Sequence, residues 1–365
     1  MIYLDHNSTT NVLEKVKAII AENLKEPLNA SSVHYYGRNA RKLLEESREV
    51  IAQTLGIKLG RGGYKIIFTS GGTEANNLVI NNFESVLCPS IEHAAIIEPA
   101  KKVKNTTALK VNKDGIIDLV FLQEVAPSDQ KTLVSVMMAN NETGVIQPIK
   151  EVVQIARDKG FLVHTDMVQA FGKINVNLQE YDVDFATISA HKIGGLVGIG
   201  ALIVKDNITI SPSILGGGQE RSERSGTENV LGAICFAKAA EVACGNIDEY
   251  AKKTSDLRDY IESEIKKSGN GFVIAKNSNR LPNTSLIASN KVNADAMLIQ
   301  FDMEGIAVSN GSACSSGKVK SSHVLQAMGY SEDVSKSVIR VSLGNNNTMK
   351  DAEEFIRVWN KVHGK

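Results

Sequence analysis

The sequence predicts an α/β fold in which helices cover both faces of a mainly parallel sheet. Short apolar runs of strand length recur through the first two thirds of the chain, at 65–69, 133–138, 161–164, 185–189 and 200–204. Stretches with helical spacing of apolar residues accompany them, as at 43–55 and 149–159. Strands that alternate with helices are typical of parallel sheets that are covered on both sides.

The pattern changes after about residue 250. Two amphipathic helices are expected there, at 255–267 and 348–362, with short strand-like pieces between them. Thr348 is a suitable N-cap for the second helix. The apolar face of that helix is formed by Phe355, Val358, Trp359 and Val362. We therefore expect a large domain over residues 13–250 and a smaller α+β domain made of residues 1–12 and 251–365.

Composition excludes several classes of protein. The 365 residues are 42% hydrophobic, which is enough to bury a sizeable core. Lys plus Arg and Asp plus Glu both number 41, so no net charge draws the chain toward nucleic acid or a membrane surface. No run of apolar residues is long enough for a membrane span, and the first residues do not resemble a secretory signal.

Four cysteines show neither zinc-site nor disulfide-framework spacing: Cys88, Cys235, Cys244 and Cys314. This usage favours a reducing compartment, and we expect a cytoplasmic protein without a metal. The alanine-rich surroundings of Cys235 and Cys244 indicate a buried helix, in which a thiol behaves as a small apolar group.

Two loops that follow predicted strands carry polar residues that are candidates for binding a ligand. In the first, Ser70-Gly71-Gly72-Thr73 precedes a helix, where backbone N–H groups and a hydroxyl favour an anion. An ordinary strand-to-helix turn would have the same composition. In the second, Asp166 ends an apolar strand, where a buried carboxylate needs a partner such as a protonated ring nitrogen. A helix N-cap is the alternative for Asp166.

Two further loops complete the set. Lys192 follows a buried strand among small residues, and burial there would free its amine to form a Schiff base. A solvent-exposed loop lysine is the alternative. The stretch 216–227 combines glycines, arginines and hydroxyls, which suits a phosphate or carboxylate but equally a flexible surface loop.

The order of these four loops resembles that of the class V aminotransferases, which depend on pyridoxal 5′-phosphate (PLP). The similarity to group I cysteine desulfurases runs nearly end to end. It is carried by Ser70-Gly71-Gly72-Thr73-Glu74-Ala75-Asn76-Asn77, Glu92-His93, Asn140-Asn141-Glu142-Thr143-Gly144, His164-Thr165-Asp166, Ser189-Ala190-His191-Lys192, Arg224-Ser225-Gly226-Thr227, Gly311-Ser312-Ala313-Cys314-Ser315-Ser316 and Ile339-Arg340-Val341-Ser342. The resemblance implies PLP-dependent transferase fold type I, with a seven-stranded type of sheet in the large domain and a smaller α+β C-terminal domain.

The resemblance also implies residue roles. Lys192 would hold PLP covalently and move the proton of the substrate Cα, while His93 would stack on the ring and take part in proton transfer. Asp166 would pair with the ring nitrogen and Gln169 with the ring hydroxyl, and Asn141 would contact the ring edge or the substrate. Arg340 would grip the substrate carboxylate. The phosphate ligands would be Gly72, Thr73, Ser189, His191 and, from the second subunit of a homodimer, Thr227.

Cys314 lies in a stretch, 309–322, that is almost free of bulky apolar side chains and has little to bury. We expect this segment to move, so that the thiolate reaches the substrate sulfur and then carries it outward as a persulfide. Lys318 and Lys320 would favour the thiolate. The resemblance implies that the chain converts L-cysteine to L-alanine and passes the sulfur to an acceptor protein. The acceptor would serve iron–sulfur cluster assembly, as an Fe–S scaffold, or tRNA thiolation.

The chain departs from the family pattern at two places. Gly195-Leu196-Val197-Gly198 stands where the family usually has Gly-Pro-Lys-Gly, and Ala30 stands where a proline is common. The C-terminal extension that often docks a scaffold is expected to be reduced. Two alternatives stay open: a selenocysteine or cysteine lyase of the same fold, and a non-catalytic PLP-fold partner in a sulfur-transfer complex.

Overall fold

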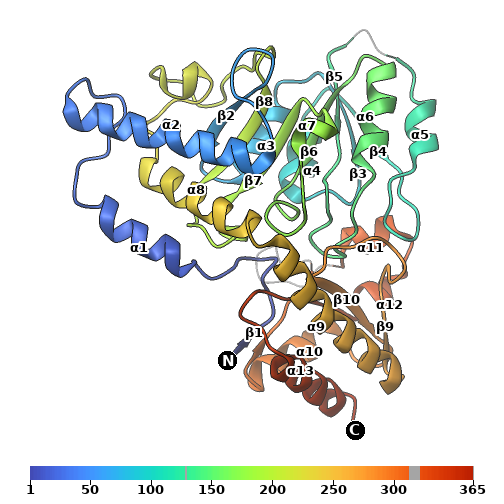
Figure 1. Cartoon of the computed structure of the whole chain (residues 1–365). Coiled ribbons are helices and arrows are strands. Elements are labelled where there is room, and N and C mark those ends of the chain that lie inside the picture. The colour runs from blue at the N-terminus through green and yellow to red at the C-terminus, as the bar shows by residue number, and fades with distance from the viewer. Residues whose placement is uncertain (128–129, 312–320, 365) are drawn as a thin grey trace.

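The computed structural model describes residues 1–127, 130–311 and 321–364. The larger part of the molecule is a sheet between layers of helices (Figure 1). The smaller part lies below it in that view and holds both ends of the chain, with the N-terminal strand beside the C-terminal elements (Figure 1).

The large sheet has seven strands in the order β2-β8-β7-β6-β5-β3-β4. Their bounds are β2 Tyr64–Thr69, β3 Ser85–Pro89, β4 Asn105–Leu109, β5 Thr132–Ser135, β6 Leu162–Asp166, β7 Phe185–Ser189 and β8 Gly200–Lys205. Only β8 runs against its neighbours, pairing antiparallel with β2 and β7, whereas the other pairs are parallel. The predicted mainly parallel sheet is therefore confirmed.

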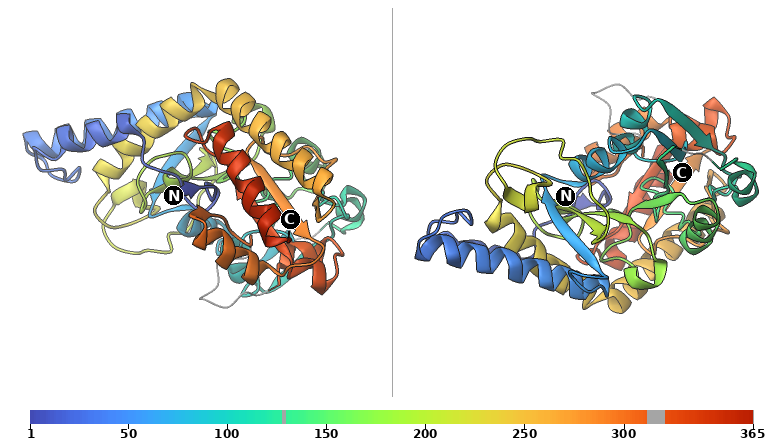
Figure 2. Two further views of the ribbon diagram at one scale, coloured as in Figure 1. Left: turned by 90° about the horizontal axis from the view of Figure 1, so that it is seen from below. Right: turned by 90° about the horizontal axis from the view of Figure 1, so that it is seen from above.

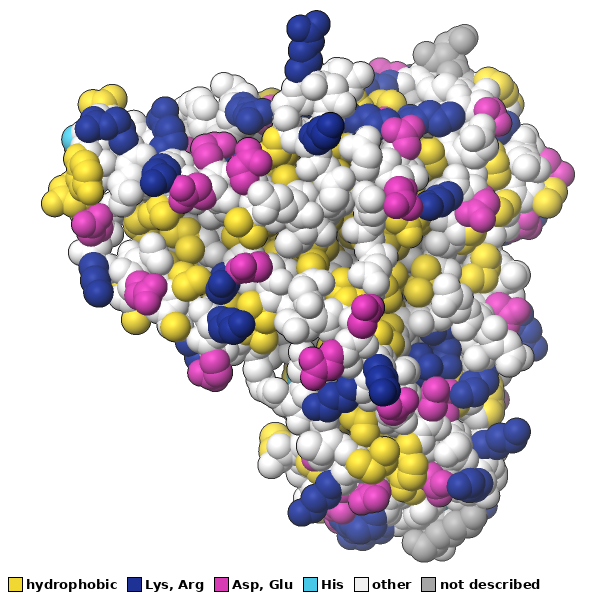
Figure 3. Space-filling model, in the orientation of Figure 1, with side chains coloured by type: hydrophobic (Ala, Val, Ile, Leu, Met, Phe, Trp, Pro, Cys, Tyr) yellow, Lys and Arg dark blue, Asp and Glu magenta, His cyan; other side chains and the backbone are white. Residues whose placement is uncertain are grey.

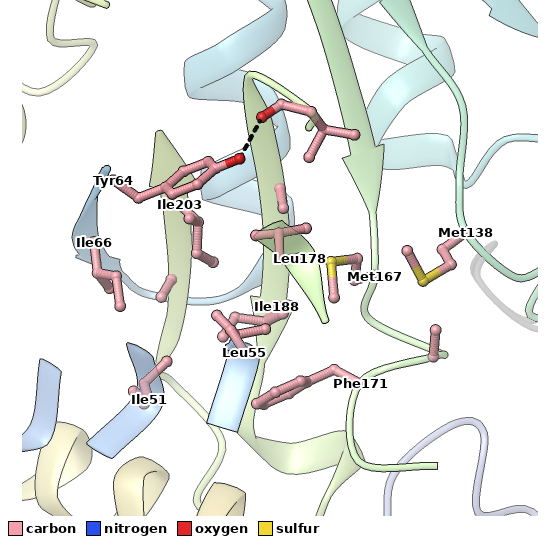
Figure 4. Packing of buried hydrophobic residues seen from close by; sticks show 14 of the residues in the cluster. Ile51, Leu55, Tyr64, Ile66, Met138, Met167, Phe171, Leu178, Ile188 and Ile203 are labelled. Carbon is pink, nitrogen blue, oxygen red and sulfur yellow. Dashed lines mark hydrogen bonds between the residues drawn. The ribbon is translucent and has the colours of Figure 1, made fainter. Parts of the chain in front are cut away.

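Successive side chains of a strand point to opposite faces of the sheet, and apolar side chains on both faces explain why helices cover both. On β2, Ile66 and Phe68 join the larger core cluster, which includes α2 (Tyr35–Leu55) and α8 (Val230–Cys244). Ile67, which points the other way, joins the cluster of α3 (Gly72–Ile80) and α4 (Ala94–Ala100). Figure 4 shows the first face, where Ile51 and Leu55 of α2 approach Ile188 of β7.

The remaining helices of the large part are α1 (Glu14–Asn23), α5 (Leu119–Glu124), α6 (Ile149–Asp158) and α7 (Leu178–Tyr181). The helix expected at 149–159 corresponds to α6, and its buried residues Ile149, Val152 and Ala156 belong to the larger cluster. Tyr64 at the start of β2 closes the same layer by donating to the carbonyl of Val183, at 3.1 Å (Figure 4).

Two strands were not expected from the sequence. β4 is an edge strand of five residues, four of which are exposed, so it has no apolar run to reveal it. β3 is short and lies beside it. The expected strand at 133–138 ends as a regular strand at Ser135, but Val136 and Met138 continue to donate to the carbonyls of His164 and Asp166.

The smaller part is built on the antiparallel sheet β12-β10-β9. Its elements are β1 Ile2–Tyr3, β9 Gly271–Val273, β10 Thr284–Ser289, β11 Ile306–Ala307, β12 Val338–Ser342, α9 Ile247–Ser268, α10 Ala294–Met303, α11 His323–Ala327, α12 Glu332–Ser335 and α13 Met349–Val362. Helices α9 and α13 lie side by side (Figure 2). Thr348 forms the predicted cap, as part of a capping box with Asp351.

The core of the smaller part explains which face of α13 is buried. Phe355, Val358 and Trp359 are fully buried, and the ring of Phe355 stacks on Phe301 of α10 with 4.9 Å between centroids. Leu4 from the N-terminal segment packs in the same cluster. Helices α8 and α9 meet at 68°, near the expected domain boundary, although the division into two domains remains a prediction.

In the described part of the chain, no single helix has both the length and the apolar character to cross a membrane. The pair α8 and α9 has them only when its two bent halves are taken together.

Candidate active site

The carboxyl ends of β2, β6 and β7 open onto one cavity of about 350 Å³. Its wall includes Thr73 in the first turn of α3, Asp166 at the end of β6 and Lys192 just after β7. His93, which caps α4, and Arg340 of β12 also line it. Because the carboxyl ends of parallel strands share one edge of a sheet, side chains that are distant in sequence meet there.

The N-terminus of α3 forms one end of the cavity. A Cβ on Gly72 would lie 2.9 Å from a methyl of Val168, so a larger residue could not occupy this position without a shift. The absence of a side chain leaves the first N–H groups of α3 and the exposed hydroxyl of Thr73 open to an anion. Glu74 also holds this turn, accepting from the Ser70 amide at 2.7 Å and from Arg224 at 2.8 Å.

Asp166 ends β6 and is 6% exposed. One carboxylate oxygen accepts from Asn76 at 2.7 Å and the other from the Val168 amide at 2.9 Å. These donors are uncharged, and the described residues provide Asp166 with no ion pair. The carboxylate is thus fixed in orientation, but no cation of the described residues pairs with it. The carbonyl oxygen of the Asn76 side chain is buried and has no hydrogen-bond partner among the described residues.

Lys192 follows β7 in the short 3-10 helix η1 (Ala190–Lys192) and is half-buried. Its amine donates to the carbonyls of Asn7 and Ser8, at 2.7 and 2.6 Å. His191 contacts the Thr9 hydroxyl at 3.2 Å, and burial together with the charges of Lys192 and Lys173 lowers its pKa to about 4. His191 is therefore neutral near pH 7 in this structure.

Gln169 occupies the wall between Asp166 and the N-terminal segment. Its amide nitrogen donates to the Asn7 carbonyl at 3.0 Å, and its amide oxygen accepts from Lys173 at 2.7 Å. Neither Asn7 nor Lys173 was predicted from the sequence. Asn7 lies 166 residues from Lys173, and only the fold brings them together.

His93 caps α4, and its Nδ1 accepts from the Ala95 amide at 3.1 Å. When the ring is neutral, the proton is therefore on Nε2. Glu92, the preceding residue, is fully buried and one of its oxygens accepts from the Met137 amide at 2.6 Å. Burial raises the pKa of Glu92 well above its usual value, so this carboxyl is protonated more readily than a surface glutamate.

Arg340 projects from β12 and is 3% exposed. Its guanidinium donates to Asp5 at 2.6 Å, to the Ser8 hydroxyl at 2.8 Å and to the Asn141 carbonyl at 3.0 Å. The side chain of Asn141 lines the cavity. The Arg340 Nε has no hydrogen-bond partner in the part of the chain that the structure describes.

The cavity adjoins a larger one of about 690 Å³, which shares His93, Asn141 and Gly311 with it. Its wall includes Ser321 and His323. Ser322 donates to the buried Glu142 at 2.6 Å, and burial raises the pKa of that carboxyl. Cys314, Lys318 and Lys320 lie outside the described residues, but the described residues on either side of them border these cavities.

Comparison with known proteins identifies the family. The class V aminotransferase profile matches residues 2–355. The chain belongs to the class V aminotransferase family. Within it, the chain is 38% identical to cysteine desulfurase IscS of Dictyoglomus turgidum, over 99% of this chain and 94% of that protein. It is 37% identical to cysteine desulfurase IscS 1 of Archaeoglobus fulgidus, over 98% and 96%.

A solved structure agrees with this placement among the cysteine desulfurases. The NifS-like protein of Rickettsia africae superposes with a TM-score of 0.94 at 43% sequence identity, over the full length of both chains. The fold predicted from the sequence, an α/β fold of the PLP-dependent type, is thereby confirmed.

Class V aminotransferases depend on PLP, and the cavity fits that group. Among the described residues, it combines the N-terminus of α3 at Gly72, a buried carboxylate that forms no ion pair, and a lysine amine. These suit a phosphate, a protonated ring nitrogen and an aldehyde respectively. A volume of about 350 Å³ is in the range of small-molecule sites.

The structure brings most residues predicted from the sequence to this cavity: Gly72, Thr73, His93, Asn141, Asp166, Gln169, Ser189, His191, Lys192 and Arg340. Thr227 is exposed and does not line it in this chain. The three described cysteines are not suited to act as nucleophiles. Burial raises the pKa of Cys88 to about 12 and that of Cys235 and Cys244 to about 11. These three remain protonated thiols at neutral pH.

Proposed function

We propose that this cysteine desulfurase holds PLP on Lys192 and passes the sulfur of L-cysteine to Cys314. The observation that supports this most is the joining of Lys192, Asp166 and Arg340 in one cavity at the carboxyl edge of the sheet. A nucleophilic amine, an uncompensated carboxylate and a guanidinium are three different requirements of amino-acid chemistry on PLP, and they meet within one volume.

When bound, PLP supplies an electron-withdrawing ring that stabilises negative charge at the substrate Cα. The carboxylate of Asp166, held by Asn76 and the Val168 amide, would keep a proton on the ring nitrogen. Gln169 would donate its amide to the ring hydroxyl. Gly72, Thr73, Ser189 and His191 would bind the phosphate, with the uncharged His191 as a hydrogen-bond donor.

Arg340 would bind the substrate carboxylate. A buried guanidinium in a cavity is suited to a bidentate contact, and Asp5, Ser8 and the Asn141 carbonyl already fix its plane. Asn141 would contact the substrate or the ring edge from the same side. Binding of the L-cysteine carboxylate at Arg340 would thereby fix the orientation of the substrate in the cavity that Lys192 also lines.

Lys192 and His93 would move protons. The Lys192 amine would accept the Cα proton and return one to the carbon skeleton before L-alanine leaves. His93, whose Nδ1 is occupied by the Ala95 amide, would use Nε2 for exchange with the substrate thiol.

Cys314 would be the acceptor of sulfur. It is three positions after Gly311, which lines the cavity, and three extended residues span at most about 11 Å. Its thiolate would attack the substrate sulfur, forming an S–S bond as the C–S bond breaks. The persulfide would then pass to an acceptor protein in the cytoplasm, serving iron–sulfur cluster assembly or tRNA thiolation.

A homodimer is part of this proposal. Exposed apolar side chains occur at the start of α2 and in the loops before Thr227, including Val33, Tyr35 and Leu215, which are 88%, 64% and 81% exposed. The group at the start of α2 is visible at the left of Figure 3, on a face where acidic and basic side chains are otherwise interspersed. A second subunit that covers these residues would place Thr227 at the partner's phosphate site. The large domain 13–250 and the small domain 1–12 with 251–365 would each contribute to the site.

Incubation of the protein with PLP and L-cysteine, followed by peptide mass measurement, tests the proposal. We expect one added sulfur on the peptide that contains Cys314, with L-alanine formed alongside. Cys314→Ser should lose both the modification and desulfurase turnover but keep the visible absorbance of bound PLP, whereas Cys88→Ser should behave as the wild type. Undiminished sulfide release by Cys314→Ser would contradict the proposal and favour a lyase.

A further inference from the structure

A buried lysine behind the cavity, Lys173, has no part in the chemistry described above. It follows β6 in the irregular segment 167–174 and is 3% exposed. Lys173 and Lys192 border the same small cavity of about 70 Å³, whose lining does not include Asp166.

The surroundings of Lys173 are unusual for a buried lysine. Its amine donates to the side-chain oxygens of Asn7 and Gln169, at 2.8 and 2.7 Å. Both acceptors are uncharged, and within the described residues Lys173 forms no ion pair. Burial lowers its pKa well below the usual value, and the charges of Lys192 and Arg340 act in the same direction. A buried amine without a carboxylate costs stability, so the fold alone gives little reason to keep it.

The contact with Gln169 determines which end of that amide faces the site. An amide side chain has a donor end and an acceptor end of nearly equal size. The Lys173 amine carries at least two N–H groups in either protonation state, and these match the two oxygens that it contacts. Gln169 must therefore direct its oxygen to Lys173 and its NH₂ group toward the cavity and the Asn7 carbonyl.

The contact with Asn7 reaches Lys192. Lys173 and Asn283 both donate to the Asn7 side-chain oxygen, at 2.8 and 3.1 Å. The backbone carbonyl of Asn7 in turn accepts from Lys192 at 2.7 Å. Lys173 thus holds Asn7, which contacts Lys192, and Gln169, which is expected to contact the PLP ring.

We propose that Lys173 is a positioning residue, which fixes the amide of Gln169 and the segment at Asn7 so that both meet the cofactor in one orientation. This inference rests on the proposed PLP site. It predicts that loss of Lys173 weakens cofactor binding through Gln169, without any contact between Lys173 and PLP.

The test is a titration of the cofactor-free protein with PLP, followed by its visible absorbance. Lys173→Met should weaken PLP binding about fivefold to tenfold, the usual worth of a hydrogen bond that is no longer held in place. Lys173→Gln, which keeps an NH₂ donor, should recover part of the affinity. Arg157→Met, at the opposite edge of the sheet, is the matched control: it also removes a cation and should lower the melting temperature, but it should leave PLP affinity unchanged.

A double-mutant cycle shows whether Lys173 acts through Gln169. In a Gln169→Leu background, adding Lys173→Met should weaken PLP binding by less than about twofold more. Unchanged affinity in both Lys173 variants, or full additivity with Gln169→Leu, would overturn the inference. A wild-type protein that develops no visible band with PLP would instead overturn the proposed function, and this inference with it.

Discussion

Two buried aspartates at opposite edges of the same sheet are held in different ways. Asp184 directly precedes β7 at the amino edge and is 2% exposed. It accepts from both terminal nitrogens of Arg157, at 2.7 and 2.9 Å, and from the Val163 amide at 2.7 Å. Asp166, at the carboxyl edge, is 6% exposed and accepts only from the uncharged Asn76 and the Val168 amide among the described residues.

The difference shows where the protein has left a charge for a ligand to balance. A buried carboxylate is stable when a cation of the protein faces it, as at Asp184. At Asp166 the described residues supply orientation but no cation, and a cavity lies beside it. The amino edge at Asp184, called the framework edge below, is therefore complete by itself. For the carboxyl edge at Asp166, called the site edge, we propose that a positively charged ring balances the carboxylate.

The largest expected effect is a loss of enzyme activity that follows substitution of Asp166 but not of Asp184. Asp166→Asn should lower desulfurase kcat by about 10²-fold to 10³-fold, because the ring nitrogen would no longer be held in its protonated form. Asp184→Asn should lower stability but leave the kcat of the folded enzyme near that of the wild type. Steady-state alanine formation by both variants gives the comparison, and equal losses of kcat would remove the distinction between the edges.

The second effect is on stability at the framework edge. Arg157→Met leaves Asp184 buried with only the more distant amine of Lys205, at 3.6 Å, as its cation. We expect the free energy of unfolding to fall by about 2 kcal/mol, allowing for the partial exposure of Arg157. Urea unfolding of the cofactor-free protein measures this change. Asp166→Asn in the same assay should change stability by less than about 1 kcal/mol, and a larger loss would mean that Asp166 is part of the framework.

A third prediction concerns the substrate side of the site edge. Arg340→Gln should raise the KM for L-cysteine about tenfold to a hundredfold, since a charge-assisted contact to the substrate carboxylate is lost. Arg357→Gln, an exposed arginine paired with Glu354 and Glu304, is the control and should leave KM unchanged. A fall in kcat without a change in KM would place Arg340 outside substrate binding.

The smallest expected effect is on the pH dependence of stability, through His164 in the middle of β6. Its ring is held by the hydroxyls of Ser135 and Thr187, at 2.9 and 3.0 Å, and burial lowers its pKa from 6.5 to about 3. As the pH falls below 6.5, the unfolded chain takes up the proton first, so this contribution to stability is present above pH 6.5 and is lost progressively toward pH 3.

Between pH 7 and pH 5 this loss is about 2 kcal/mol. His164→Gln should therefore show a correspondingly smaller fall in the free energy of unfolding over that range, measured with urea at both pH values. An equal fall in the variant and the wild type would show that His164 titrates normally in the folded protein.

The sequence was informative where chemistry follows a strand directly. Asp166 and Lys192 stand at the ends of apolar runs, and the fold brings such ends to one edge, so their proximity could be predicted from order alone. Lys173 and Asn7 could not be, because their meeting depends on contacts between segments 166 residues apart. The edge strand β4 was missed for a different reason: its side chains are exposed, and it has no apolar pattern. The domain boundaries and the roles of Cys314 and Thr227 stay predictions.

The most direct test of the account is to locate PLP on the chain. Borohydride treatment of the protein with PLP fixes lysine-bound cofactor to its lysine, and digestion with peptide mass measurement then identifies the residue. We predict cofactor mass on the peptide that carries Lys192, and none on that peptide in Lys192→Ala. Cofactor on Lys173 or another lysine, with Lys192 unmodified, would contradict it.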